Sequence, residues 1–204
     1  MEKVIYTRWL AVELRKRGCQ ILREEINENH PQFNCWIFRE DEHFTNAFEE
    51  IILGYKNILY KIAKTRLSNI DDIEDAVQET IISAYQSIYK LRDTTKFKSW
   101  IITILINKCN RINKKKRKSN VSYEEIDIER YVGKCDVSTS IGFDELISVL
   151  SKDEKTIMTL FYSEDYTSKE ISKILKLNEN TVRRKISDAR KKIERKLKEV
   201  ESYE

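Results

Sequence analysis

Apolar residues recur every three or four positions along most of the chain beyond residue 40, which is the spacing of one face of a helix. Long stretches of this kind cover residues 41–67, 71–89 and 96–118. Shorter ones follow at 144–150, 152–162, 168–175 and 181–200. An acidic residue, Asp71 or Asp72, is well placed to cap the second long helix. The pattern predicts a mainly α-helical protein.

Residues 1–43 follow a different pattern. The expected elements, in chain order, are a strand at 4–6, a helix at 9–17 and strands at 19–26 and 32–38. Gly18 stands where a glycine commonly ends a helix, because it adopts the left-handed conformation without strain. We therefore expect a small α+β module of βαββ order.

Residues 119–143 show no sustained period and hold an excess of acidic over basic side chains. This composition is typical of a linker. The expected organisation is the βαββ module at 1–43, a helical domain at 44–118, a flexible acidic linker at 119–143 and a second helical domain at 144–204.

The residue composition argues against several classes of fold and function. The 204 residues include only 4 Gly and 1 Pro, which argues against glycine-rich phosphate loops and turn-dense β-sandwiches. The 4 cysteines form no C-x-x-C pair and the 2 histidines lack the usual ligand spacing, so we expect no metal, no cofactor and no enzymatic activity. No signal peptide is visible and the longest apolar run, 100–106, is too short to span a bilayer. We expect a cytoplasmic protein without membrane insertion.

Charge is unevenly distributed. The chain has a net charge of +4, but the basic excess is concentrated in residues 46–118 and is greatest in the run Lys114–Lys118. A run of this kind is either a solvated helix end or a contact for a polyanion, and it favours the second reading only when other features agree.

Residues 167–197 contain the clearest local motif. A short helix with Ile171 and Ile174 inward is followed by a turn at 176–178, and Asn178 is placed to cap a second helix. This is the geometry of a helix-turn-helix, whose second helix enters the major groove, although an ordinary helical hairpin has the same spacing. The residues expected to contact duplex DNA are Asn180, Thr181, Arg183, Arg184, Lys185 and Ser187.

Two stretches resemble an alternative sigma factor of bacterial RNA polymerase, of the extracytoplasmic-function (ECF) type. The first runs through Asp71–Tyr85, DDIEDAVQETIISAY, and Lys96–Asn107, KFKSWIITILIN, and is similar to the family's region 2. The second, Leu150–Leu197, is similar to region 4. The resemblance implies two helical domains and a protein that binds core polymerase and directs it to promoters.

The resemblance also implies residue roles. The clamp helices of the polymerase's largest subunit would contact Asp72, Asp75, Gln78, Glu79 and Ile82. The melted −10 promoter element would be held by Lys96, Lys98, Asn107, Lys108, Arg111, Lys114 and Lys115, and region 4 would read the −35 element as duplex. Phe97 and Trp100 either stack on bases or belong to the core. An anti-sigma factor is a further candidate partner.

The alternative is a phage-type or ordinary helix-turn-helix regulator that binds duplex DNA without acting as a sigma subunit. Such a regulator needs neither a clamp-binding helix at 71–89 nor a single-strand surface at 96–115, so these stretches favour the sigma factor. Members of the family usually begin near residue 44, which leaves residues 1–43 as an addition. Two hypotheses for this addition are that it covers the DNA-binding face or docks a regulator.

Overall fold

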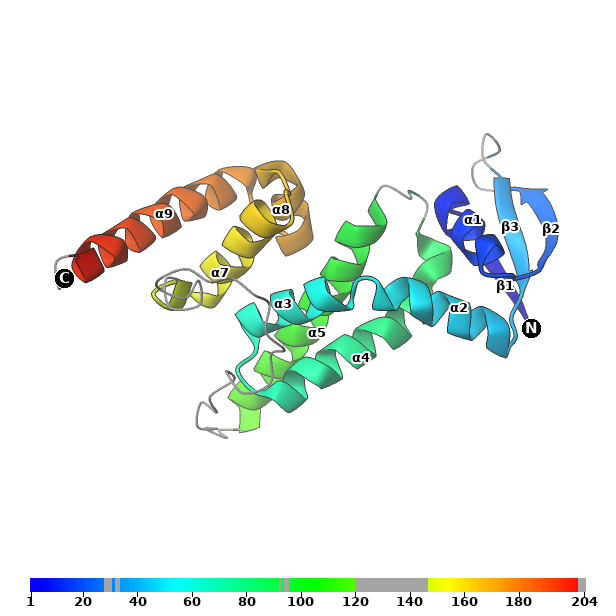
Figure 1. Cartoon of the computed structure of the whole chain (residues 1–204), viewed down its shortest axis with the longest axis horizontal. Coiled ribbons are helices and arrows are strands. Elements are labelled where there is room, and N and C mark those ends of the chain that lie inside the picture. The colour runs from blue at the N-terminus through cyan, green and yellow to red at the C-terminus, as the bar shows by residue number, and fades with distance from the viewer. Residues whose placement is uncertain (28–30, 32–33, 92, 94–95, 120–146, 202–204) are drawn as a thin grey trace. The chain divides into compact units, whose positions relative to one another are not determined.

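The computed structural model describes residues 1–27, 31, 34–91, 93, 96–119 and 147–201, which are mainly helical with one small sheet, as the sequence predicts (Figure 1). These residues form two compact units. The first combines Met1–Leu59 with Ala76–Lys108, and the second combines Tyr60–Asp75 with the described residues from Cys109 onward. Residues 120–143 of the expected linker lie outside the described residues.

The N-terminal module has the expected βαββ order. Its elements are β1 (Glu2–Ile5), α1 (Arg8–Lys16), β2 (Ile21–Ile26) and β3 (Asn34–Arg39). The sheet is antiparallel with β3 in the centre, and the β2 register shifts between Ile21 and Arg23 (Figure 1). Gly18 has φ +84° and follows α1, and a Cβ there would lie 3.2 Å from His43 Nε2. The positive φ favours glycine at this position, and an added Cβ would also crowd the end of the His43 ring.

The module packs into the same compact unit as the helices that follow it. Phe38 on β3 lies 5.7 Å from Phe44, measured between ring centroids. His43 Nε2 is 2.8 Å from the carbonyl oxygen of Arg17, beyond the end of α1. Phe38 and Phe44 are both fully buried, so the module shares a hydrophobic core with the helices of this unit, and the exposed His43 contact adds a polar link.

The single helix expected at 41–67 is in fact two helices, α2 (Glu42–Leu53) and α3 (Lys56–Arg66). Gly54 ends α2, where the Tyr55 N–H bonds to the carbonyl of Ile52 instead of continuing the helix. The apolar spacing continues through the break because both helices bury one face, so the pattern alone gives no sign of the interruption. The low helix propensity of glycine supplies the physical reason for the position of the break.

The next two long helices agree with the sequence. They are α4 (Ile70–Ser87), which is followed by the 3₁₀ turn η1 (Ile88–Lys90), and α5 (Phe97–Ser119). The predicted cap of α4 is wrong, because Asn69 Oδ1 accepts from the N–H groups of Asp71 and Asp72 at 2.7 and 3.3 Å. Both aspartates instead lie in the first turn, where their charge favours the positive end of the helix dipole.

The C-terminal helices carry the expected motif. The helix predicted at 144–150 is described only from Ile147, and the one at 152–162 is α7 (Lys152–Met158) followed by a π-helical turn, η4 (Thr159–Ser163). The last two helices are α8 (Ser168–Leu175) and α9 (Glu179–Glu201). No described helix is both long and apolar enough to cross a membrane.

Candidate functional site

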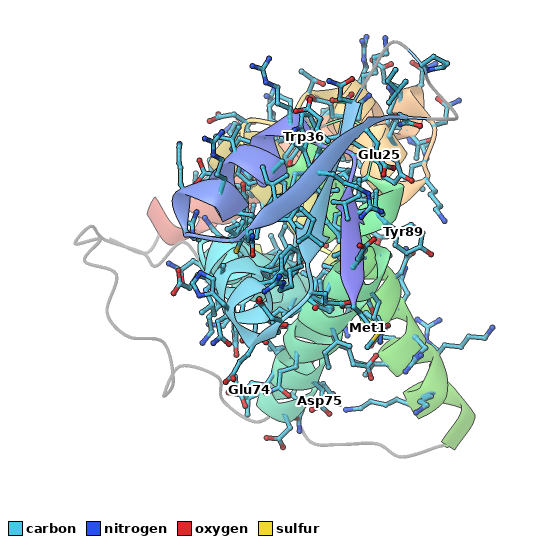
Figure 2. All side chains as sticks on the ribbon, turned by 90° about the vertical axis from the view of Figure 1, so that its right-hand side faces the viewer. Met1, Glu25, Trp36, Glu74, Asp75 and Tyr89 are labelled. Carbon is cyan, nitrogen blue, oxygen red and sulfur yellow. The ribbon has the colours of Figure 1, made fainter. Side chains whose placement is uncertain are left out.

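Helix α4 carries the residues assigned to polymerase binding on one face. Their helical spacing places Asp72, Asp75, Gln78, Glu79 and Ile82 on this face. The opposite face is buried and contains Ile73, Ala76, Val77, Thr80 and Ala84. Figure 2 shows Asp75, with the adjacent Glu74, near the start of α4. Ile82 is 57% exposed, so the face offers an apolar side chain among carboxylates, which suits a protein partner.

Two carboxylates of this α4 face form ion pairs with α5. Lys108 Nζ lies 3.1 Å from Glu79 Oε2, and Lys116 pairs with Asp72. The sequence assigns Glu79 to polymerase and Lys108 to DNA, yet in the structure they bind each other. Partly exposed pairs of this kind contribute about 0–1 kcal/mol, so a partner can displace either one at small cost.

Helix α5 carries most of the residues assigned to the −10 element on its exposed side. Asn107, Arg111, Lys114 and Lys115 are exposed, and the half-buried Trp100 lies on the same face by helical spacing. Lys98 does not share this face, because the spacing places it above the buried Leu105 and Cys109. Lys96 is exposed just before α5 and forms an ion pair with Asp93. The structure therefore brings the assigned residues together along α5 with the exception of Lys98.

The two aromatic residues of α5 have different environments. Phe97 is 2% exposed, and its ring lies 5.3 Å from Trp9, 5.2 Å from Tyr55 and 5.8 Å from Trp100. Phe97 is therefore a core residue. The sequence left open whether it stacks on bases or belongs to the core, and the structure places it in the core. Trp100 is half-buried and keeps part of its ring on the exposed face. The contact of Trp9 with Phe97 had no sequence signal, since the two residues are far apart in the chain.

The helix-turn-helix is formed by α8 and α9. The Thr167 hydroxyl accepts from the Glu170 N–H at 3.3 Å while Glu170 accepts from the Thr167 N–H at 2.9 Å, which caps α8 at its first turn. Lys176 ends α8 in the left-handed conformation with φ 54°. Asn178 Oδ1 accepts from the Asn180 N–H at 2.8 Å, which confirms Asn178 as the cap of α9.

The first turns of α9 present the residues assigned to duplex DNA. Asn180, Arg183, Arg184 and Ser187 are exposed, and Thr181 and Lys185 are partly exposed. The opposite face of α9 buries Val182, Ile186 and Ala189. Arg183 also pairs with Glu179 at 2.6 Å, so its guanidinium must leave that carboxylate to contact DNA. All six residues therefore lie outside the buried stripe of α9.

An ion pair between the partly exposed Lys192 and the buried Glu154 joins α9 to α7. Glu154 is 6% exposed, and both of its carboxylate oxygens accept from Lys192 Nζ at 2.8 and 2.9 Å. The same carboxylate caps α7 by accepting from the Ser151 N–H at 2.8 Å. Burial alone raises the pKa of Glu154, but the Lys192 charge and the Ser151 donors outweigh it and leave the pKa below its usual range.

The described side chains offer little other chemistry. No group of three or more His, Cys, Asp or Glu residues in the described ranges is placed to hold a metal ion. Cys19, Cys35 and Cys109 are buried thiols, and burial raises the pKa of Cys109 to about 11.

Comparison with known proteins supports the sequence resemblance. Residues 51–118 match the family model "Sigma-70 region 2" and residues 141–193 match "Sigma-70, region 4". The chain is 31% identical to the RNA polymerase sigma factor SigV of Bacillus subtilis over 69% of its length and 84% of the relative. It is 32% identical to the ECF RNA polymerase sigma-E factor of Haemophilus influenzae over 74% of its length and 87% of the relative.

A solved structure shows the same fold. The sigma factor RpoE, crystallised in complex with the anti-sigma factor NepR from Bartonella quintana, superposes with a TM-score of 0.60 at 24% identity. The match covers 74% of this chain and 96% of the solved chain. Neither family model reaches residues 1–50, which hold the N-terminal module. Because both sigma-70 regions are matched and the relatives align over most of their length, the chain belongs to the ECF sigma factors of the sigma-70 family.

Proposed function

We propose that this sigma factor divides its work among three helices: α4 binds core polymerase, α5 holds the melted −10 element, and α9 reads the −35 element. The observation that carries the proposal is the separation of exposed chemistry between α4 and α9. The α4 face is mainly acidic with an exposed isoleucine, whereas the first turns of α9 are basic. The first composition suits a protein surface of complementary charge and the second suits duplex DNA.

The α4 face docks on the clamp helices of the polymerase's largest subunit. Asp75, Gln78 and Ile82 are exposed and available without rearrangement. Glu79 and Asp72 reach the same partner by exchanging their α5 lysines for basic residues of the polymerase. This exchange also releases Lys108 toward DNA, so core binding and −10 binding are coupled through one ion pair.

The α5 surface holds the −10 element as a single strand. Single-stranded DNA is bound by a positive groove together with side chains on which bases stack. Arg111, Lys114 and Lys115 supply charge, and Trp100 is the aromatic side chain on the same face. Lys98 lies on the other side of α5, where it is less suited to the same strand.

The partners and setting follow from this role. The chain does no covalent chemistry of its own and works in the cytoplasm, where core polymerase and promoter DNA are found. An anti-sigma factor is a further partner, since the Bartonella quintana relative is seen with one. Regulation by such a protein requires it to cover one of the three helices named above.

Run-off transcription tests the proposal. Core polymerase of Bacillus subtilis, with and without this protein, is supplied with pooled AT-rich genomic fragments, and discrete protein-dependent transcripts are expected. The double variant Gln78→Ala/Glu79→Ala should lose transcripts and core binding but keep its fold and duplex binding. An ordinary regulator would instead bind duplex DNA in a gel shift and give no transcripts with this core or that of a closer relative.

A further inference from the structure

Helix α1 of the N-terminal module carries an exposed basic surface. Its exposed arc consists of Arg8, Val12, Arg15 and Lys16, which neighbour one another at helical spacing. Lys16 is paired with Glu13 at 2.8 Å. Arg8 and Arg15 form no ion pair or side-chain hydrogen bond with any residue that the structure describes. The helix thus exposes two free guanidinium groups, although residues 1–45 as a whole have slightly more acid than base.

This basic arc lies beside the start of α5. Trp9, the residue after Arg8, contacts Phe97 with ring centroids 5.3 Å apart. Lys96, one of the residues assigned to the −10 element, directly precedes Phe97. In Figure 1, α1 lies on the side of the sheet nearer the start of α5. The positive charge of α1 is therefore placed next to the start of α5, the helix whose exposed side is assigned to the −10 element.

The module does not cover this end of the surface. Lys96 at this end, and Asn107 further along α5, belong to the same compact unit as the module and remain exposed with it in place. Glu13 is the one acidic residue of α1, and it pairs with Lys16 and Arg17. Other acidic residues of the module lie on the sheet: Glu24 and Glu25 are on β2, where Figure 2 labels Glu25, and Glu2 on β1 pairs with Arg23 at 2.8 Å. With Arg8, Arg15 and Lys16 against this single carboxylate, the α1 arc keeps a net positive charge, which favours an anionic partner.

We propose that Arg8 and Arg15 of α1 contact promoter phosphates next to the −10 element, which makes the N-terminal module an extension of the DNA-binding surface. The inference rests on the proposed role of α5. DNA is favoured over an acidic protein because α1 lies in the same compact unit as the start of α5, the helix to which the −10 strand is assigned, and this end already exposes Lys96. Two arginines that reach phosphates add affinity without adding sequence preference.

Single-charge variants test the contact. The probe is the strongest promoter recovered by run-off transcription, bound by holoenzyme at several salt concentrations. Arg8→Ala and Arg15→Ala should each weaken binding several-fold and reduce the slope of log affinity against log salt by about 1. Arg39→Ala is the matched control, because Arg39 is an exposed arginine at the end of β3 in the same module.

Crosslinking separates DNA from other partners. A photoreactive residue replaces Val12, which is 41% exposed in the middle of the arc, or Ile26, which is 66% exposed on β2. In the open complex, Val12 should crosslink to promoter DNA and Ile26 should not. Adducts from Val12 to a polymerase subunit, or arginine variants that match Arg39→Ala, would overturn the inference while wild-type transcripts still support the sigma role. If the wild type directs no transcription, the proposed function fails, and this inference fails with it.

Discussion

The hydroxyl of Tyr85 on α4 donates a hydrogen bond to Glu40 Oε1 at 3.0 Å, joining region 2 to the residue that follows β3. Lys3 of β1 pairs with the same carboxylate at 3.4 Å and lies 4.2 Å above the Tyr85 ring. Burial and the nearby carboxylates raise the pKa of Tyr85, so its hydroxyl remains a donor at neutral pH. The N-terminal module is thus joined to α4 by polar contacts as well as by its apolar core.

Loss of this hydroxyl should destabilise the first unit. Tyr85→Phe leaves Glu40 with one partner fewer in a partly buried position, which costs about 1 kcal/mol in the free energy of unfolding. Tyr6→Phe is the control, because Tyr6 is also half-buried in the module. Urea unfolding followed by tryptophan fluorescence measures both variants. Equal midpoints for Tyr85→Phe and wild type would contradict the prediction.

The carboxylate of Glu154 should make region 4 stability pH-dependent. Its folded pKa is lowered from 4.5, so its stabilising contribution is fully present above that value and is lost as the pH falls through the folded pKa. Glu154→Gln keeps the shape but weakens the capping box and the Lys192 pair, and should cost about 1–2 kcal/mol at pH 7.

Thermal unfolding followed by circular dichroism between pH 3 and pH 7 measures this effect. The difference in stability between wild type and Glu154→Gln should shrink toward pH 3. A difference that stays constant across this range would mean that the carboxylate charge has no part in holding α7 to α9. Glu164→Gln, which alters a half-buried glutamate of the same region, serves as the control.

The exposed side chain of Ile82 allows a direct test of whether the α4 face binds core polymerase. Ile82→Asp places a charge where a partner would bury the isoleucine, and should weaken binding to core polymerase at least tenfold while leaving the fold intact. Ile26→Asp makes the same change at another exposed isoleucine, on β2. Competition for core polymerase measured by fluorescence anisotropy distinguishes the two. Equal affinities would remove Ile82 from the interface.

DNA binding by the recognition helix α9 should depend on where along the helix an arginine stands as well as on its charge. Arg184→Ala, in the first turns of α9, should weaken binding to a −35 duplex and reduce the salt slope by about 0.9. Arg195→Ala removes the same charge from an exposed position near the other end of α9, where a groove contact is not expected. A gel shift at several salt concentrations measures both. Similar losses for the two variants would indicate general electrostatic attraction in place of groove binding.

Local sequence determined the helical part of the fold to a large extent. The bounds of α8 coincide with the predicted 168–175, and Asn178 caps α9 as expected, because caps and apolar spacing act within a few residues of one another. Gly18 ends α1 for the same reason. The region 2 and region 4 motifs were also legible, since both depend on short runs of residues with fixed spacing.

Competition between local signals could not be resolved from the sequence. Asn69, Asp71 and Asp72 are all good caps, and only the folded backbone shows that the Asn69 side chain reaches the free N–H groups. Gly54 interrupts a stretch whose apolar spacing continues unbroken on both sides. In each case several local arrangements have similar free energies, so small differences in packing decide among them.

Contacts between distant residues were decided by tertiary structure alone. The sequence places Trp9 and Phe97 in different segments, and it assigns Lys108 and Glu79 to different partners. Neither pair follows from periodicity, because helical spacing shows which face is buried but not what covers it. The sequence by itself determined most of the helices and the family to which the chain belongs, but not the break between α2 and α3. The tertiary structure decided that the N-terminal module shares a core with the region 2 helices of its unit. Packing against those helices removes more apolar surface from water than the small module could bury as a separate domain.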